Sequence, residues 1–235
     1  MQLKPQDLLV SLKLIACAGR RWTYASLAQE LGLSASEVHA CVKRGLQAGL
    51  LMEPAAGWPA VQAPESALLS EPGTAYHVGV RPRRARRSPV RPGSVHDAGA
   101  ADDNPVRAHE AHLAEFAVHG ARYAFAAVRQ PGGPGVPTGL GVMAVVQALG
   151  LPEVGGGADA WVWPHPQGPA QGEGVEPLHP SAPYAALQDE KLHEMLALLD
   201  LLRLGEPGLR SAAARRLHAL IDRASLAPER GEGHV

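Results

Sequence analysis

The most constraining feature of this sequence is a pattern of small and apolar residues within positions 23–48. Ala28 is followed after four residues by Gly32, and after ten and thirteen residues by Val38 and Cys41. Two helices that cross closely need a small residue at the crossing, a permissive residue in the turn, and apolar residues on the inner side of the second helix. All four positions are filled suitably, so the segment predicts a helix-turn-helix.

Periodicity and capping residues predict three helices in this part of the chain. Apolar residues at helical spacing favour a first helix over 7–18. Thr23 is a suitable N-cap for the second helix, and the third is expected to begin near Ala35 or Ser36 and to end at Gly49. A short strand is expected to follow the third helix.

After the third helix, the sequence no longer shows helical spacing of apolar residues. Residues 50–53 favour the short strand, and 74–80 favour either a returning strand or the start of a linker. Residues 81–105 contain almost no large apolar side chain, which indicates a linker that is disordered. The stretch 55–58, Ala-Ala-Gly-Trp, is apolar where a DNA-binding wing would carry basic residues.

A second ordered region is expected from Val106 onward. It is predicted to contain a helix near 113–124, a Pro/Gly loop at 130–141 and an apolar segment at 142–149 that is either helix or strand. An irregular stretch is expected at 155–183. Two amphipathic helices are expected at 187–204 and 209–224, joined by residues 205–208. The leucine faces of the last two helices are either the core of this region or a dimer interface.

The expected fold is therefore mainly α (α+β), in an order of four parts. Residues 1–80 would form a winged helix-turn-helix domain and 81–105 a basic, disordered linker. Residues 106–225 would form a helical C-terminal domain with Pro-rich irregular segments, followed by a disordered tail at 226–235. A hydrophobic content of 46% is enough for a substantial core.

The words LAQELGLSASEVHACVKRGLQAGLL, at positions 27–51, carry a resemblance to a known group. They resemble bacterial winged helix-turn-helix regulators of the MarR and Lrp type, and the likeness extends over about residues 5–80. Residues 161–168 and 176–181, with their Trp-Pro-x-Pro-x-Gly and Pro-Leu-x-Pro-Ser words, resemble uncharacterised bacterial winged-helix proteins over about residues 110–220, and this resemblance implies no established activity. The resemblance implies double-stranded DNA as partner, with the third helix entering the major groove and the following hairpin touching the backbone or the minor groove.

Carried over to this chain, the resemblance implies which side chains face DNA. Ser36 and His39 would reach base edges, and Lys43 and Arg44 would contact phosphates. The alternative is that these four residues form an ordinary solvated helix face. Helix pairs of this pattern also occur in winged helices that bind proteins.

Positive charge is concentrated in the first ninety residues. The net charge is +2 over residues 1–60, +4 over 61–92 and −7 over 93–235. Flexible basic arms add affinity for DNA by releasing counterions, without reading sequence. We expect such an arm here, although the same arginines would also serve a solvated linker. They are Arg81, Arg83, Arg84, Arg86, Arg87 and Arg91, of which Arg83, Arg84, Arg86 and Arg87 are the closest cluster.

The C-terminal region offers no reactive constellation. His165, Glu173, Glu176 and His179 match no metal-binding spacing, and Ser181 lacks the setting of a nucleophile elbow. We therefore expect no enzyme activity, no cofactor and no metal.

Two aromatic side chains and two thiols each allow two interpretations. Trp161 and Trp163 are either core residues or a platform for a ligand or partner. Cys17 and Cys41 lie at apolar helical positions, which is typical of reduced core thiols, and a disulfide or metal pair is the less favoured interpretation. Neither a signal peptide nor a membrane span is predicted, so a cytoplasmic protein is expected.

These patterns lead to one expected function and one alternative. The first is a sequence-specific transcriptional regulator, a repressor, that binds DNA as a homodimer and uses its C-terminal half for dimerisation, an effector or a partner. The alternative is an antitoxin-like interaction protein, whose C-terminal half binds a protein partner and whose winged helix is autoregulatory.

Overall fold

Three short helices occupy the N-terminal part of the computed structural model, which describes residues 2–18, 20–53, 106–151 and 160–225. They are α1 (Pro5–Ala16), α2 (Tyr24–Leu31) and α3 (Ala35–Gln47). This confirms the three expected helices.

Local chemistry explains where α2 and α3 begin. The hydroxyl of Thr23 accepts a hydrogen bond from the backbone N–H of Ser26, and Ser34 receives one from Glu37 in the same way. Between them, Gly32 takes a left-handed conformation with φ of 64°, which favours glycine and turns the chain sharply.

A two-stranded sheet follows α3. Strand β1 (Leu51–Met52) pairs antiparallel with β2 (Arg107–Ala108). Three stretches with expected roles lie outside the described residues: 55–58, the expected linker at 81–105, and 74–80, which was expected to be either a returning strand or the start of a linker. The strand that pairs with β1 is therefore β2, more than fifty residues later in the sequence.

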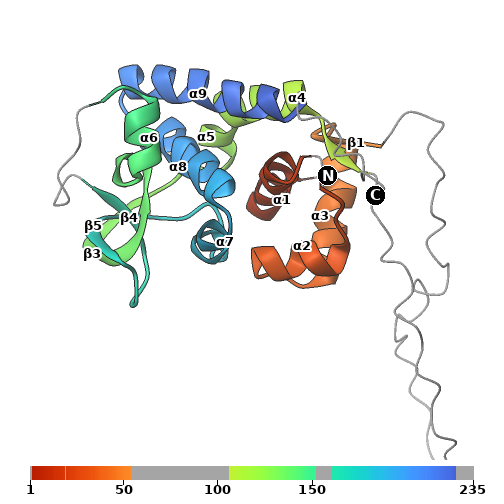
Figure 1. Ribbon diagram of the computed structural model, residues 1–235, viewed down its shortest axis with the longest axis horizontal. Helices are drawn as coiled ribbons and strands as arrows, with labels where there is room; N and C mark the ends of the chain where they lie inside the picture. The colour runs from red at the N-terminus through yellow and green to blue at the C-terminus, as the bar shows by residue number, and fades with distance from the viewer. Residues whose placement is uncertain (1, 19, 54–105, 152–159, 226–235) are drawn as a thin grey trace, which may run out of the picture. The chain divides into compact units, whose positions relative to one another are not determined.

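The rest of the described chain is mainly helical (Figure 1). The expected helix near 113–124 is present, interrupted by a π-helical turn, and the undecided segment at 142–149 is helical. The long helix expected at 187–204 begins later, because Asp189 caps a new helix there. The helices are α4 (Glu110–Glu115), η2 (Phe116–Gly120), α5 (Ala121–Ala124), α6 (Met143–Ala148), α7 (Ala182–Gln188), α8 (Glu190–Leu204) and α9 (Pro207–Ser225).

Three strands form a small closed barrel where the sequence predicted a loop and an irregular stretch, so both predictions were wrong. Strand β3 (Arg129–Thr138) pairs antiparallel with β4 (Trp161–Pro164) and β5 (Ala170–Val175), which pair parallel with each other. Glycines permit these close approaches, since a Cβ at Gly135 would collide with the backbone of Trp163.

Helix α8 lies at the centre of the C-terminal half, and a buried polar group anchors it to the barrel. The Asp200 carboxylate accepts hydrogen bonds from the Thr138 hydroxyl and the Trp163 indole N–H, each at 2.7 Å. Its other oxygen pairs with Arg203 at 2.7 Å. Arg203 in turn donates to the backbone carbonyl of Phe125. Every polar partner of this buried carboxylate is thus supplied by the fold.

Helix α1 connects the two halves. All nine residues from Asp7 to Ile15 are buried, which marks a helix enclosed on every side. It contacts α3 and also α8 and α9, and its side chains belong to the same hydrophobic core as theirs. The described residues before and after 54–105 therefore form one compact unit. None of the described helices is both long and apolar enough to cross a bilayer.

Candidate nucleic-acid interface

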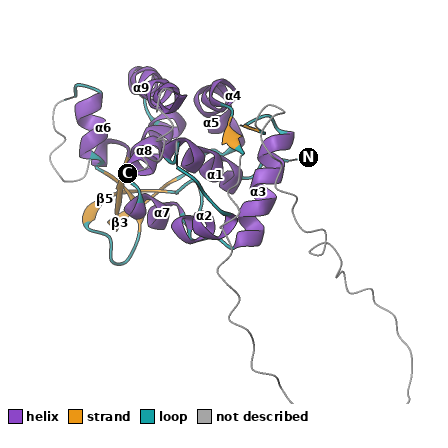
Figure 2. Cartoon of the chain, turned by 45° about the vertical axis from the view of Figure 1, so that its right-hand side comes forward, coloured by secondary structure: helices purple, strands orange, loops and turns teal. Residues whose placement is uncertain are grey.

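Helix α3 presents two chemically different sides. Val38, Cys41, Val42 and Gly45 are buried against α1, α2 and β1. On the opposite side, the predicted DNA-facing residues Ser36, His39 and Lys43 are all exposed. Figure 2 shows α3 at the margin of the folded unit, with α1 on its inner side. The structure therefore gathers three of the four expected helix residues on one accessible face.

Arg44 is placed differently from its three neighbours. Its Nε and Nη2 atoms donate to both oxygens of Asp7 on α1, at distances between 2.6 and 3.0 Å. The Asp7 side chain is 0% exposed and that of Arg44 20% exposed. The bidentate pair holds α3 on α1. This geometry does not favour the phosphate contact that the resemblance implied for Arg44, because two of its three guanidinium nitrogens are engaged within the fold.

Two further residues on this side of the molecule escaped the sequence analysis. Gln47 is exposed one helical turn beyond Lys43, so its spacing alone could have identified it. The ring of Tyr24, at the start of α2, lies 5.2 Å from the ring of His39. That contact joins residues far apart in sequence, and no local signal could have revealed it.

The first turn of α3 carries a negative charge. The Glu37 carboxylate accepts hydrogen bonds from the hydroxyl and the backbone N–H of Ser34, which hold the pKa of Glu37 below its usual range. A carboxylate at this end of a helix also complements the helix dipole. Polar groups of both signs thus line the exposed side of α3, a mixture suited to reading base edges.

Two further basic residues are exposed in the elements before and after α3. They are Arg21, just before α2, and Arg107, in β2. The predicted arm residues Arg83, Arg84, Arg86 and Arg87 lie outside the described residues, within the segment that connects β1 to β2.

Burial decides the roles of the two tryptophans and the two thiols. Trp161 and Trp163 are 6% and 1% exposed, so both are core residues. Cys17 and Cys41 are buried, free thiols, and burial raises the pKa of Cys41 to about 12. Among the described residues, no three His, Cys, Asp or Glu side chains gather to form a metal site.

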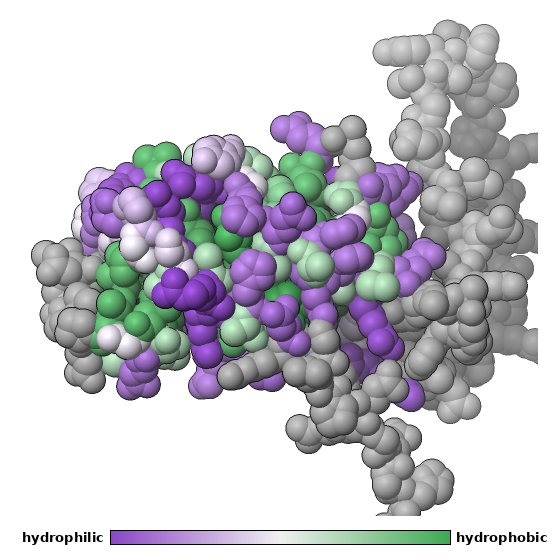
Figure 3. All heavy atoms as spheres, turned by 90° about the horizontal axis from the view of Figure 1, so that it is seen from above, coloured by the Kyte–Doolittle hydropathy of each residue, from purple (hydrophilic) through white to green (hydrophobic). Residues whose placement is uncertain are grey.

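The leucine faces of α8 and α9 belong to the core. Leu192, Leu199, Leu217 and Ile221 are all 0% exposed. The face of the molecule on the side of α4 and α9 intersperses hydrophilic and hydrophobic side chains (Figure 3). The buried leucines of these two helices are therefore core residues, which was the first of the two interpretations.

Comparisons with models of protein families, with curated proteins and with solved structures found no match for this chain.

Proposed function

We propose that this protein is a sequence-specific DNA-binding transcriptional regulator that inserts α3 into the major groove. One observation carries the proposal: Ser36, His39 and Lys43 line the accessible side of α3, with Gln47 continuing the row, while the other side is buried. A helix supported in this way can enter a groove without losing its packing.

The proposed roles follow from the chemistry of each side chain. Ser36, His39 and Gln47 offer hydrogen-bond donors and acceptors for base edges, and Lys43 offers a charge for a phosphate. The arginine-rich segment between β1 and β2 would add contacts to the DNA backbone, as a wing does in the regulators that the sequence resembles. Repression and a homodimer, both expected from the sequence, remain part of this proposal.

The direct test is fluorescence anisotropy with duplex DNA from the gene's own promoter, in competition with random duplex. We expect the promoter to compete at least about a thousandfold better than random DNA, as for specific DNA-binding proteins. Analytical ultracentrifugation of the complex would give the number of chains bound per site. Equal competition by promoter and random DNA would contradict sequence-specific binding to this promoter.

Lys43→Met tests the phosphate contact on α3. Loss of one such contact should weaken promoter binding and reduce the slope of log K against log salt concentration by about 0.9. Because Lys43 is exposed and has no ion pair within the described part of the chain, the unfolding midpoint should not change. Lys191→Met, an exposed lysine on α8, is the matched control. An identical salt slope for both variants would exclude Lys43 from the interface.

Replacing the arginine cluster tests the proposed arm. We expect a variant with Ser at positions 81, 83, 84, 86, 87 and 91 to bind both promoter and random DNA more weakly, with a shallower salt dependence. The ratio between the two affinities should change little, because phosphate contacts carry no sequence information. An unchanged salt slope would remove the arm from the proposal.

A further inference from the structure

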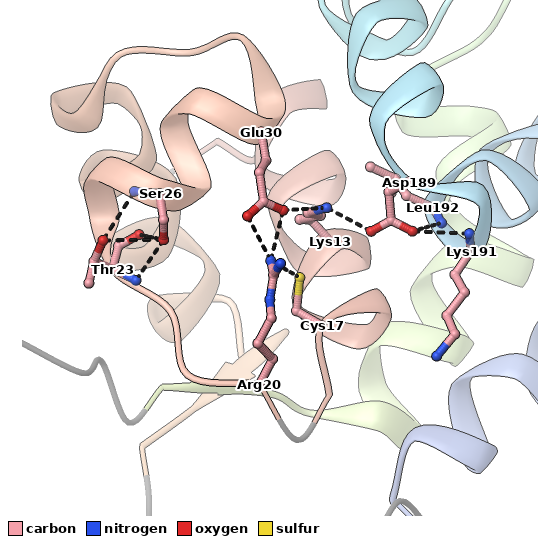
Figure 4. Close-up of polar contacts among 9 residues, drawn as sticks. All are labelled: Lys13, Cys17, Arg20, Thr23, Ser26, Glu30, Asp189, Lys191 and Leu192. Carbon is pink, nitrogen blue, oxygen red and sulfur yellow. Dashed lines mark hydrogen bonds and ion pairs between the residues drawn. The ribbon is translucent and has the colours of Figure 1, made fainter. Parts of the chain in front are cut away.

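The ammonium group of Lys13 is buried between two carboxylates from different parts of the chain (Figure 4). Its Nζ lies 2.8 Å from Glu30 Oε2 on α2 and 2.6 Å from Asp189 Oδ2, which directly precedes α8. The Lys13 side chain is only 2% exposed. A charge is kept at such depth only where it is well paired.

Each carboxylate is also held by a second partner. Glu30 accepts hydrogen bonds from Arg20 Nη2 at 2.7 and 2.8 Å. Asp189 uses its other oxygen, Oδ1, as the N-cap of α8, where it accepts from the backbone N–H groups of Lys191 and Leu192. The two oxygens of Asp189 therefore have separate tasks, one toward α8 and one toward Lys13.

The ionisation states support a charged link. Burial alone would lower the pKa of Lys13, but hydrogen bonds to Asp189 and Glu30 outweigh it and raise the pKa. Burial would raise the pKa of Asp189, yet Lys13 and the backbone donors hold it below its ordinary value. At neutral pH both groups are charged.

A second contact brings the same corner of the chain against α2. The hydroxyl of Tyr184 on α7 donates to the backbone carbonyl of Gln29, at 3.3 Å. The ring of Tyr184 also lies beside Gly32, in the turn between α2 and α3. The corner from α7 to α8 thus contacts α2 both through Lys13 and at the turn that leads into α3.

We propose that Lys13 is a positioning residue through which the α7–α8 corner sets the placement of α2 and α3. Displacing Asp189 from Lys13 would loosen the α2–α3 pair and switch the protein to weak DNA binding. The second part of this inference rests on the proposed function, whereas the first concerns the folded chain alone.

Asp189→Asn separates the two tasks of Asp189, because asparagine is also a good N-cap but carries no charge. Glu190→Gln removes one charge at the next position, on an exposed side chain, and is the matched control. In the full chain without DNA, we expect amide hydrogen exchange in α2 and α3 to be about tenfold faster in Asp189→Asn, a size typical of coupling between sites. The first turn of α8 and the control should exchange as in the unmodified protein.

Promoter binding by the same variants tests the second part. We expect about tenfold weaker binding by Asp189→Asn and unchanged binding by Glu190→Gln. Unchanged exchange in α2 and α3 would overturn the proposal whether or not the protein binds DNA. Absence of DNA binding by the unmodified protein would instead refute the proposed function, and the exchange result would still decide the first part.

A double variant, Lys13→Met with Asp189→Asn, is needed in case the single variant Asp189→Asn unfolds. It removes the buried ammonium together with the charge of Asp189, while Glu30 keeps Arg20 as its partner, so no buried charge is left unpaired. We expect it to fold stably but to keep the fast exchange in α2 and α3 and the weak promoter binding. Recovery of both properties would show that the pair only balances charge, and would overturn a positioning role.

Discussion

Arg44→Met is expected to lower the free energy of unfolding by about 3 kcal/mol, the lower end of the cost of breaking one half of a buried ion pair. The substitution would leave the Asp7 carboxylate, which is 0% exposed, without its bidentate partner. Methionine retains most of the aliphatic volume, so the loss reports the charge rather than a cavity. Urea denaturation followed by tryptophan fluorescence measures it.

Lys43→Met is the matched control, because it removes a cation from the adjacent, exposed position of the same helix. We expect Arg44→Met to lower the stability of the fold and Lys43→Met to lower only the affinity for DNA. If Arg44→Met kept the stability of the unmodified protein and lost only DNA affinity, the result would support the phosphate contact that was first expected for Arg44.

Asp200→Ala is expected to be more damaging still, with a loss of about 4 kcal/mol in the free energy of unfolding, because it leaves a buried arginine without its counter-charge. The Thr138 hydroxyl and the Trp163 indole would also lose their acceptor in a dry interior. The tryptophan emission of the folded state should change as well, since Trp163 donates directly to Asp200.

The control for this variant is Asp222→Ala, an exposed aspartate on the neighbouring helix α9. Its unfolding midpoint in urea should match that of the unmodified protein. Similar midpoints for the two alanine variants would show that the buried network around Asp200 contributes little net stability, as happens where desolvation cancels the pairing energy.

The α2–α3 pair could be predicted from sequence because its signals are local. Thr23, Ser34 and Gly32 act within a few residues of their own positions. Arg44 shows the limit of that logic. It lies three residues after the buried Cys41, which hints at an inward side, but its partner Asp7 is 37 residues away. Only the packing of α1 against α3 reveals the pairing.

The strands β3 to β5 were not predicted from the sequence, for a different physical reason. Proline and glycine normally interrupt strands, so their density around positions 130–141 indicated a loop. In the folded chain, the glycines instead allow neighbouring backbones to approach, as Gly135 does beside Trp163. The boundary between α7 and α8 at Asp189 was also missed, because the apolar periodicity of the sequence continues across this N-cap.

The enclosure of α1 has a consequence for how this chain can be divided. Here, separating the first three helices from the rest would strip α8 and α9 from α1 and expose its leucines to water. We therefore expect that the first three helices, expressed without α8 and α9, would not fold stably.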